Sequence, residues 1–285
     1  MSAGAAGFGV PPLVVALLLG AALIHATWNA LLRGGEDRLK SITLMCLVAA
    51  AASLPLMAVL PAPARASWPY AALSAALQIG YCLFLVRAYR DGQLGQVYPI
   101  ARGAAPLLVA LGAAAFAGER LAPPAILGLV LVSGGIMGLS LGRGRADLRS
   151  TLAALVTGAF IAGYMVTDGV GVRLSGQPVA YYAWMSFAQG APMPLVYLAL
   201  RRRLPSLAPD RQTWIALGGG VLGFAGYGIV VWALSMTAMA KVSGLRETSI
   251  LFAAILGAVF LKEPFTLRRA ACAVVICAGA MLLAA

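Results

Sequence analysis

Ten apolar runs of about 20 residues follow one another along this chain of 285 residues, separated by short polar connections. A helix of about 20 apolar residues spans the roughly 30 Å of hydrocarbon in a bilayer. The runs predict membrane helices at residues 13–32, 42–60, 70–88, 96–117, 123–141, 151–173, 178–200, 213–235, 241–261 and 265–284. The strict alternation that marks the strands of a transmembrane barrel is absent from them. We therefore predict an all-α integral membrane protein with ten transmembrane helices.

The charge of the chain supports the same class. Charged residues make up only 11% of the sequence, whereas soluble domains carry about a quarter. The net charge of +12 could suggest nucleic acid, but the basic residues flank the apolar runs and form no recognition motif. We therefore expect them to contact anionic membrane lipid and to set the orientation in the membrane, with no nucleic-acid partner.

A duplication organises the chain. Arg102 and Glu119, at the start and end of one apolar stretch, recur as Arg246 and Glu263, and both pairs lie 144 positions apart. A shared offset of this kind indicates a repeated unit. We expect one repeat at 13–141 and a second at 151–284, each with five helices. An odd number of helices makes the second repeat enter the membrane from the opposite side, so the repeats are inverted.

The orientation follows from the distribution of Lys and Arg. The odd-numbered connections hold 15 of these residues and the connections on the other side hold 4. The positive-inside rule places the side richer in Lys and Arg in the cytoplasm. We predict a multi-pass protein of the cytoplasmic (inner) membrane with both termini outside. The first run has no Lys or Arg before it, so we interpret it as a membrane helix and not as a signal peptide.

Polar and ionisable groups inside a span are costly, so each one is a hypothesis for a site. His25, Trp28 and Asn29 share one face of the first helix because they are three and four positions apart. His25 is the only histidine, and it could change its protonation near neutral pH or hydrogen-bond a substrate. The alternative is that neighbouring helices satisfy these side chains.

Arginines stand at matching positions of the two repeats. Arg102 lies one turn after Tyr98, in a helix that Pro99 and Pro106 should kink. Its guanidinium could bind an anionic substrate or a buried carboxylate, or it could snorkel to lipid headgroups. Arg246 is the matching residue of the second repeat, and we expect the two arginines to engage an anionic group of the substrate alternately or to gate each face.

Two carboxylates lie inside predicted spans. If the chain is a transporter, Glu247 and Asp168 are candidates, with His25, to carry the proton whose movement is coupled to transport. For Glu247 the alternative is a structural ion pair with another helix. For Asp168 the alternative is contact with interfacial water, because few residues separate it from the end of its helix.

Aromatic residues divide into two groups. The residues expected to line a substrate cavity, or else to pack the bundle, are Tyr81, Tyr227 and Trp232. Tyr181, Tyr182 and Trp184 lie near the start of the seventh helix, where we expect an interfacial aromatic belt.

Enzymatic chemistry has little support. The chain has no catalytic constellation, no metal-ligand spacing and no P-loop, and its four cysteines lie inside apolar runs. We predict no enzyme activity, cofactor, metal or disulfide. Glu119 and Glu263 are expected to complement the dipoles of the fifth and tenth helices, which they precede.

The chain resembles the EamA family of the drug/metabolite transporter superfamily. The resemblance rests on His25–Asn29, Tyr98–Gly103, Asp168–Arg173, Leu245–Ser249, and the turns Gly118–Glu119 and Lys262–Pro264. It implies a ten-helix inverted-repeat fold with a central cavity lined by the first, third, fourth, sixth, eighth and ninth helices. It also implies export or exchange of small metabolites, often coupled to protons. Members commonly keep both termini in the cytoplasm, so the charge count here departs from the family pattern.

We therefore predict a secondary active transporter that moves a small metabolite by alternating access, with proton-coupled export or exchange. The predicted substrate-binding residues are His25, Trp28, Asn29, Tyr81, Tyr98, Arg102, Tyr227, Trp232 and Arg246. The alternatives are a passive facilitator, an importer of a small organic anion such as a phosphonate, or a non-transporting interaction or sensor module. The chain is expected to act as a monomer or a homodimer.

Overall fold

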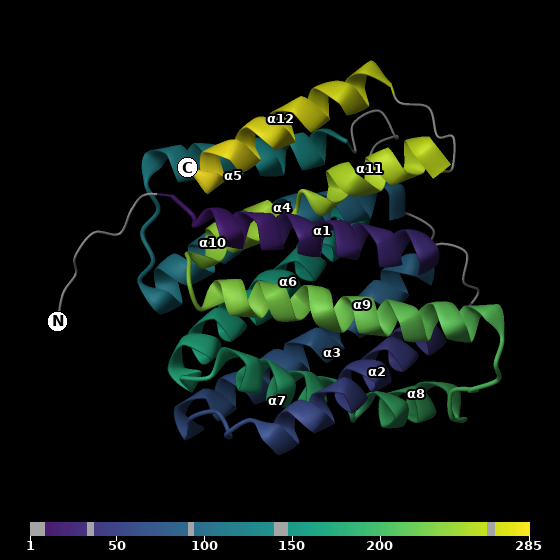
Figure 1. The fold of residues 1–285 in the computed structure, drawn as a ribbon. Coiled ribbons are helices and arrows are strands. Elements are labelled where there is room, and N and C mark those ends of the chain that lie inside the picture. The colour runs from purple at the N-terminus through teal and green to yellow at the C-terminus, as the bar shows by residue number, and fades with distance from the viewer. Residues whose placement is uncertain (1–8, 33–36, 91–93, 140–147, 261–265) are drawn as a thin grey trace.

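The computed structural model describes residues 9–32, 37–90, 94–139, 148–260 and 266–285 (Figure 1). Within these ranges, side chains are described for 9–29, 37–85, 99–139, 151–259 and 266–285. All regular structure in the described ranges is helical, and no strand occurs in them.

Helices of the first half are α1 (Pro12–Leu32), α2 (Arg38–Val59), α3 (Trp68–Arg90), α4 (Leu94–Ala117) and α5 (Pro123–Gly138). A short 3₁₀ helix, η1 (Arg65–Ser67), precedes α3. Helices of the second half are α6 (Leu148–Ser175), α7 (Pro178–Gly190), α8 (Met193–Arg201), α9 (Arg211–Leu234), α10 (Met239–Arg246), α11 (Ser249–Phe260) and α12 (Leu267–Ala284).

The helices confirm an all-helical, multi-pass membrane protein. Eight helical segments of the described chain are long and apolar enough to cross a membrane, and the shorter apolar helix α5 adds to them. Two predicted spans are broken. The span at 178–200 forms α7 and α8, which meet next to Pro192, a residue that has no backbone N–H to continue a helix. The span at 241–261 forms α10 and α11, which meet at Glu247 and Thr248.

Aspartates at helix starts define one side of the bundle. Oδ1 of Asp37 accepts a hydrogen bond from the backbone N–H of Lys40 at 3.0 Å, so α2 begins at Arg38, before the predicted 42. Oδ1 of Asp210 caps α9 in the same way, accepting from the backbone N–H of Thr213 at 2.6 Å. The Lys40 ammonium lies 3.2 Å from Oδ2 of Asp210, so the two helix starts are neighbours. We call this side the Asp37 face.

The opposite side lies at the other end of α9. This helix has 24 residues and is therefore about 36 Å long, enough to cross the bilayer. At its C-terminal end, Nε of Arg173, in the last turn of α6, donates to the carbonyl of Leu234 at 3.0 Å. The Arg173 guanidinium also lies 2.7 Å from Glu119, which follows α4. We call this side the Glu119 face.

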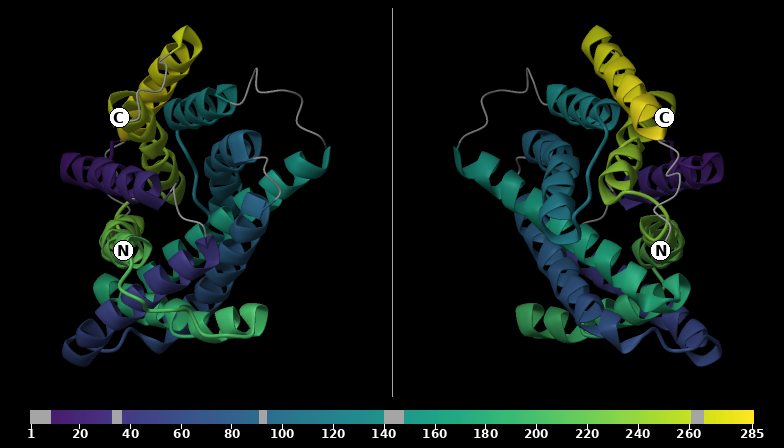
Figure 2. Two further views of the ribbon diagram at one scale, coloured as in Figure 1. Left: turned by 90° about the vertical axis from the view of Figure 1, so that its right-hand side faces the viewer. Right: turned by 90° about the vertical axis from the view of Figure 1, so that its left-hand side faces the viewer.

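The first helices of the two halves run in opposite directions. Helix α6 ends at the Glu119 face, whereas α1 ends a few residues before Asp37 on the Asp37 face. Helices from the two halves nevertheless pack against one another: α4 lies along α6, α5 along α12, and α1 along α9 (Figures 1 and 2). The chain thus forms one bundle whose interior receives side chains from both halves, such as Leu18, Val109, Met165 and Leu234.

Candidate functional site

Ionisable side chains from four segments meet inside the bundle. We define the central polar cluster as Arg102 on α4, Asp168 on α6, Arg246 at the end of α10, and Glu247 in the turn that follows. All four side chains are buried, with 2% exposure for Arg102 and 8% for Arg246. Burial of Arg102 removes the alternative that it snorkels to lipid headgroups.

Arg102 and Glu247 form a buried ion pair. The Nε of Arg102 lies 2.8 Å from Oε2 of Glu247, and its Nη2 donates to the hydroxyl of Ser249 at 3.1 Å. The pair joins α4 of the first half to the α10–α11 junction of the second half. Each ion loses its hydration on burial, so the close approach of the opposite charge offsets part of that cost. Arg102 therefore contacts a buried carboxylate, one of the partners expected from the sequence.

The break between α10 and α11 gives Glu247 its place. Two carbonyls of the junction accept only from residues three positions ahead: the N–H of Thr248 donates to Leu245 at 3.2 Å, and that of Ile250 to Glu247 at 3.0 Å. Such tightened turns interrupt the α-helical ladder. Irregular backbone at membrane depth is tolerated where protein surrounds it, and here it turns the Glu247 side chain toward α4.

Arg246 is held by neutral groups. Its Nη1 donates to the Tyr164 hydroxyl at 3.3 Å and approaches the Met165 sulfur at 3.8 Å. Its Cζ lies 5.3 Å from the centre of the Tyr227 ring, in a cation–π contact. Among the side chains that the structure describes, no carboxylate forms an ion pair with Arg246. Arginine stays protonated in proteins, so among the described side chains Arg246 is a positive charge without a bonded anion.

Hydroxyl groups surround the carboxyl of Asp168. Oδ1 accepts from the Tyr181 hydroxyl at 3.1 Å, and Oδ2 accepts from the Tyr227 hydroxyl at 2.6 Å. Asp168 is fully buried, so the expectation that it could reach interfacial water is wrong.

Tyr181 is a site residue that the sequence did not indicate. It was expected with Tyr182 and Trp184 in an interfacial belt, but Tyr181 and Tyr182 are both buried. The hydroxyl of Tyr182 donates to the carbonyl of Phe224 at 2.6 Å. Tyr181 reaches Asp168 across α6 because Gly171 has no side chain, and a Cβ at that position would collide with the tyrosine hydroxyl.

Tyr227 connects the charged groups of the cluster. Its hydroxyl binds Asp168 while its ring faces Arg246. The ring also makes an edge contact with Tyr164 at 5.9 Å, and Tyr164 makes another with Tyr81 at 5.9 Å. The structure thus brings the predicted residues Tyr81 and Tyr227 together with the arginine.

The remaining predicted residues differ in their surroundings. The His25 ring packs edge-on against Trp28 at 5.0 Å and lies within electrostatic range of Arg102 and Arg246. The Asn29 amide donates to the backbone carbonyl of His25 at 2.8 Å. Trp232 packs, half-buried, against the hydrophobic core near the end of α9. The side chain of Tyr98 lies outside the described residues.

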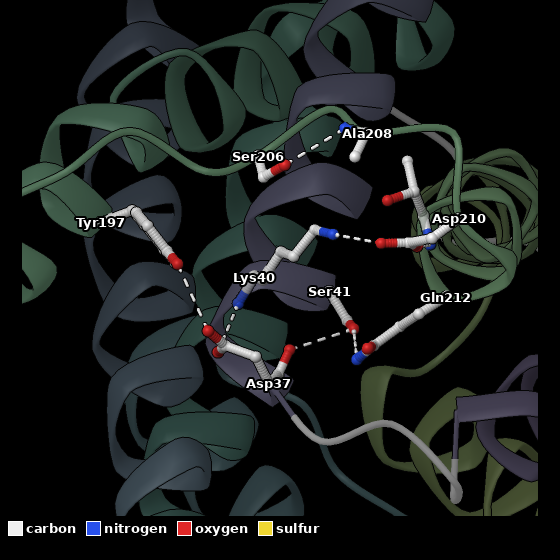
Figure 3. Close-up of polar contacts among 9 residues, drawn as sticks. Asp37, Lys40, Ser41, Tyr197, Ser206, Ala208, Asp210 and Gln212 are labelled. Atoms are coloured by element: carbon white, nitrogen blue, oxygen red, sulfur yellow. Dashed lines mark hydrogen bonds and ion pairs between the residues drawn. The ribbon is translucent and has the colours of Figure 1, made fainter.

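Polar contacts on the Asp37 face link α8 and the start of α9 to the start of α2 (Figure 3). The Asp37 carboxylate accepts from the Tyr197 hydroxyl and from the Arg201 guanidinium, both at 3.3 Å. Gln212 donates to the Ser41 hydroxyl at 3.3 Å.

Asp210 contributes the other ion pair of this face. The backbone N–H of Thr213 and the Lys40 ammonium both stabilise its carboxylate, which lowers the pKa of Asp210. Lys40 and Asp210 therefore tie the starts of α2 and α9 together, and Asp37 ties the start of α2 to α8.

Glu119 has a different partner from the one expected. Its carboxylate accepts from the backbone N–H of Met239, the first residue of α10, at 2.9 and 3.3 Å. The cap residue of α5 is Ala122, which has no side-chain hydrogen bond. Glu119 therefore stabilises the start of α10 and not that of α5. Glu263 lies outside the described residues.

Metal chemistry finds no support in the described part of the chain. Among the residues that the structure places, no group of three or more His, Cys, Asp or Glu side chains could hold a metal ion. The cluster can instead bind charged groups, donate hydrogen bonds from tyrosines, and hold protons on two carboxylates.

Comparisons with known proteins agree with this arrangement. The family model described as the EamA-like transporter family matches residues 12–141 and again residues 148–285. The chain is similar to a solved crystal structure of a protein, with a TM-score of 0.74 and 20% sequence identity. The alignment covers 95% of this chain and 94% of the chain in that structure. At that identity the likeness concerns the fold alone. No curated protein matches the chain.

Proposed function

Because the chain belongs to the EamA-like transporter family, we propose that it is a secondary transporter that moves a small organic anion across the cytoplasmic membrane by alternating access. In this proposal residues 13–141 and 151–284 form two inverted repeats of five spans each. The opposite directions of α1 and α6 support that arrangement. The excess of Lys and Arg in the odd-numbered connections supports a cytoplasmic Asp37 face, with both termini outside.

The observation that carries the proposal is the state of Arg246. It is a buried cation whose direct contacts, Tyr164, Met165 and Tyr227, are neutral, so an anionic group that enters the cluster gains an ion pair without displacing another one. Arg102 already holds Glu247 and binds the substrate only when that pair opens. Arg246 therefore binds first, and Arg102 contributes later in the cycle. The Tyr81, Tyr164 and Tyr227 rings offer contact to an apolar or aromatic body.

Proton coupling has a physical route in the same cluster. A proton on Glu247 removes the negative charge that holds Arg102, which makes this second guanidinium available to the substrate. Asp168 offers a second position for a proton, next to the Tyr227 hydroxyl that links it to Arg246. His25 lies near both arginines and is the third candidate to exchange protons.

Two directions of transport follow from this chemistry. Export or exchange is the form implied by the family resemblance, with the released substrate replaced by a proton or by a second substrate. The charges of the cluster favour a second form, import of an anion such as a phosphonate. A proton on Glu247 and an anion on the arginines reinforce each other, so an inward proton gradient drives both inward.

The test begins with a substrate screen on the purified full chain. Organic anions, cations and zwitterions are compared by the rise in melting temperature that each one produces. Compounds that stabilise the protein are then assayed for flux in proteoliposomes, with and without a pH gradient. The proposal expects an anion to be carried, Arg246→Gln to lose at least about tenfold in flux, and exposed Arg211→Gln to keep it.

Two results would refute the proposal. Flux that is the same in Arg246→Gln and in the unchanged chain would remove the anion site. Tight binding of a small molecule or a protein without any flux would favour the interaction or sensor module. Flux of an anion that ignores the pH gradient would leave a passive facilitator and remove the coupling.

A further inference from the structure

Arg173 gathers three acceptors at the Glu119 face. Its Nη2 lies 2.7 Å from Oε1 of Glu119 and donates to the carbonyl of Thr237 at 2.8 Å. Its Nε donates to the carbonyl of Leu234, the last residue of α9, at 3.0 Å. One guanidinium therefore fastens the end of α6 to the segment that joins α9 to α10.

Glu119 fastens the other side of the same segment. Its carboxylate caps α10 by accepting from the backbone N–H of Met239. The N-cap residue of α10, Ala238, makes no side-chain hydrogen bond. The carboxylate comes from the connection between α4 and α5, in the first half of the chain. Together the two residues hold the α9–α10 junction between the two halves at one face of the membrane.

Helix α10 carries this attachment to the central polar cluster. It has only eight residues, from Met239 at the Glu119 face to Arg246 in the cluster. At 1.5 Å per residue the two ends lie about 10 Å apart. Met239 is also seated tightly on α6, because a Cβ at Gly169 would come within 2.6 Å of its Cε. Displacement of Met239 therefore moves Arg246.

We propose that Arg173 and Glu119 form a latch that keeps the Glu119 face closed and positions α10, and with it Arg246, in the closed state. The proposal rests on the alternating-access function argued above. The latch opens when the α9–α10 junction moves away from α6, which frees the Met239 N–H and the carbonyls of Leu234 and Thr237. Water can replace these bonds, since the Arg173 and Glu119 side chains are 33% and 13% exposed. Partly exposed ion pairs are weak enough to break and re-form in each cycle.

The test measures access to the cluster and needs no substrate. A reporter cysteine replaces Ser249, beside Arg102, in a background with alanine at Cys46, Cys82, Cys272 and Cys277. A membrane-impermeant thiol reagent is applied from each side of sealed vesicles. In Glu119→Ala and in Arg173→Gln, we expect the reporter cysteine to be labelled from the Glu119 face about three- to fivefold faster than in the unchanged background. Labelling from the Asp37 face should slow, because opening one face closes the other.

The matched control is Lys40→Gln, which removes an exposed ion pair from the other end of α9. It should not speed labelling from the Glu119 face. Arg173→Lys keeps the charge but reaches fewer acceptors, so its labelling should lie between that of the unchanged chain and Arg173→Gln. Unchanged rates in both latch variants would overturn the proposal. Faster labelling from both faces would overturn it too, since that result means general loosening.

A second measurement covers a reporter background that fails to fold. Hydrogen–deuterium exchange of the otherwise unchanged chain is followed in a peptide that contains Met239. We expect Glu119→Ala to speed exchange at the start of α10 and Lys40→Gln to leave it unchanged. Equal exchange in the two variants would remove the latch. A working latch in a protein that carries no compound would refute the transport function and leave the latch intact.

Discussion

Glu247 Oε2 lies 2.8 Å from Nε of Arg102, and this contact joins residues that are 145 positions apart in the chain. The two partners belong to different halves, so the ion pair crosses the boundary between the repeats. Arg246, which stands at the position equivalent to Arg102, contacts tyrosines and a methionine. The duplication thus supplies two arginines with different electrostatic surroundings.

Because of this difference the two arginines are electrostatically unequal, which they would not be in a symmetric pair. Since Glu247 directly follows Arg246, any motion that carries Arg246 toward a substrate also pulls on the partner of Arg102. In the proposed transport cycle, binding of an anion at Arg246 is therefore coupled mechanically to release of Arg102 from Glu247. The helix break at Glu247 and Thr248 interrupts the α-helical hydrogen-bond ladder between α10 and α11.

Removal of one member of the ion pair should destabilise the protein. Glu247→Gln removes the carboxylate that lies 2.8 Å from the buried Arg102 guanidinium, and the loss of one member of a buried ion pair costs about 3–5 kcal/mol. The measurement is thermal or denaturant-induced unfolding of the purified chain in detergent. Arg201→Gln, at the exposed pair with Asp37, should cost less than about 1 kcal/mol. Equal effects of the two variants would show that the Arg102 pair is solvated.

The Tyr227 hydroxyl should matter more than that of Tyr182. Tyr227→Phe removes a hydrogen bond to the buried Asp168 carboxyl and keeps the ring that faces Arg246. Hydrogen bonds to charged groups contribute about 1.5–3 kcal/mol, and neutral ones about 1 kcal/mol. Tyr182→Phe, which loses a bond to the Phe224 carbonyl, is therefore the matched control. A larger loss of stability in Tyr182→Phe would contradict a charged Asp168.

The sequence was sufficient for the all-helical membrane class, although eight helices of the described chain, where ten spans were predicted, are long and apolar enough to cross a membrane. Apolar runs report directly on the bilayer, and charged side chains inside them, such as Arg102, Asp168 and Glu247, are conspicuous because burial is costly. Partners were harder to predict. Tyr181 reaches Asp168 from another helix, and that contact depends on how α6 and α7 are rotated, which local pattern does not encode. In the sequence, a tyrosine near a helix end looks the same whether it lies in the lipid interface or packs inside the bundle.

Contacts between residues far apart in the sequence explain a second difference between prediction and structure, namely which helix Glu119 caps. Glu119 precedes α5 in the chain and yet caps α10, 120 positions further on. Local reasoning about the helix dipole found the correct kind of interaction with the wrong helix. The break between α10 and α11 also escaped prediction, because no proline or glycine stands at Glu247 or Thr248. At this junction α4 packs against α10, and Arg102 of α4 forms the ion pair with Glu247.

Acid should weaken the Asp37 face through Asp210. The pKa of Asp210 is lowered in the folded protein by the backbone N–H of Thr213 and by Lys40, from an ordinary value of 3.8. The stabilisation is therefore complete above 3.8 and is lost as the pH falls below it through the lower folded value. We expect Asp210→Asn to lose less of its melting temperature than the unchanged chain between about pH 5 and about pH 3. If the melting temperatures of Asp210→Asn and of the unchanged chain fall equally with pH, Asp210 takes no part in the acid sensitivity.

Gly171 should resist substitution, in contrast to a glycine elsewhere in the bundle. Gly171→Ala places a methyl group against the Tyr181 hydroxyl, so either the tyrosine leaves Asp168 or α6 and α7 move apart. Gly134 on α5 has open space at the same position, and alanine favours a helix by about 1 kcal/mol over glycine. We expect Gly134→Ala to be neutral or stabilising and Gly171→Ala to lower the melting temperature by several degrees. Addition of Tyr181→Phe removes the hydroxyl at the collision and should recover part of the loss caused by Gly171→Ala. If this double variant is less stable than either single variant, the close contact is not the cause.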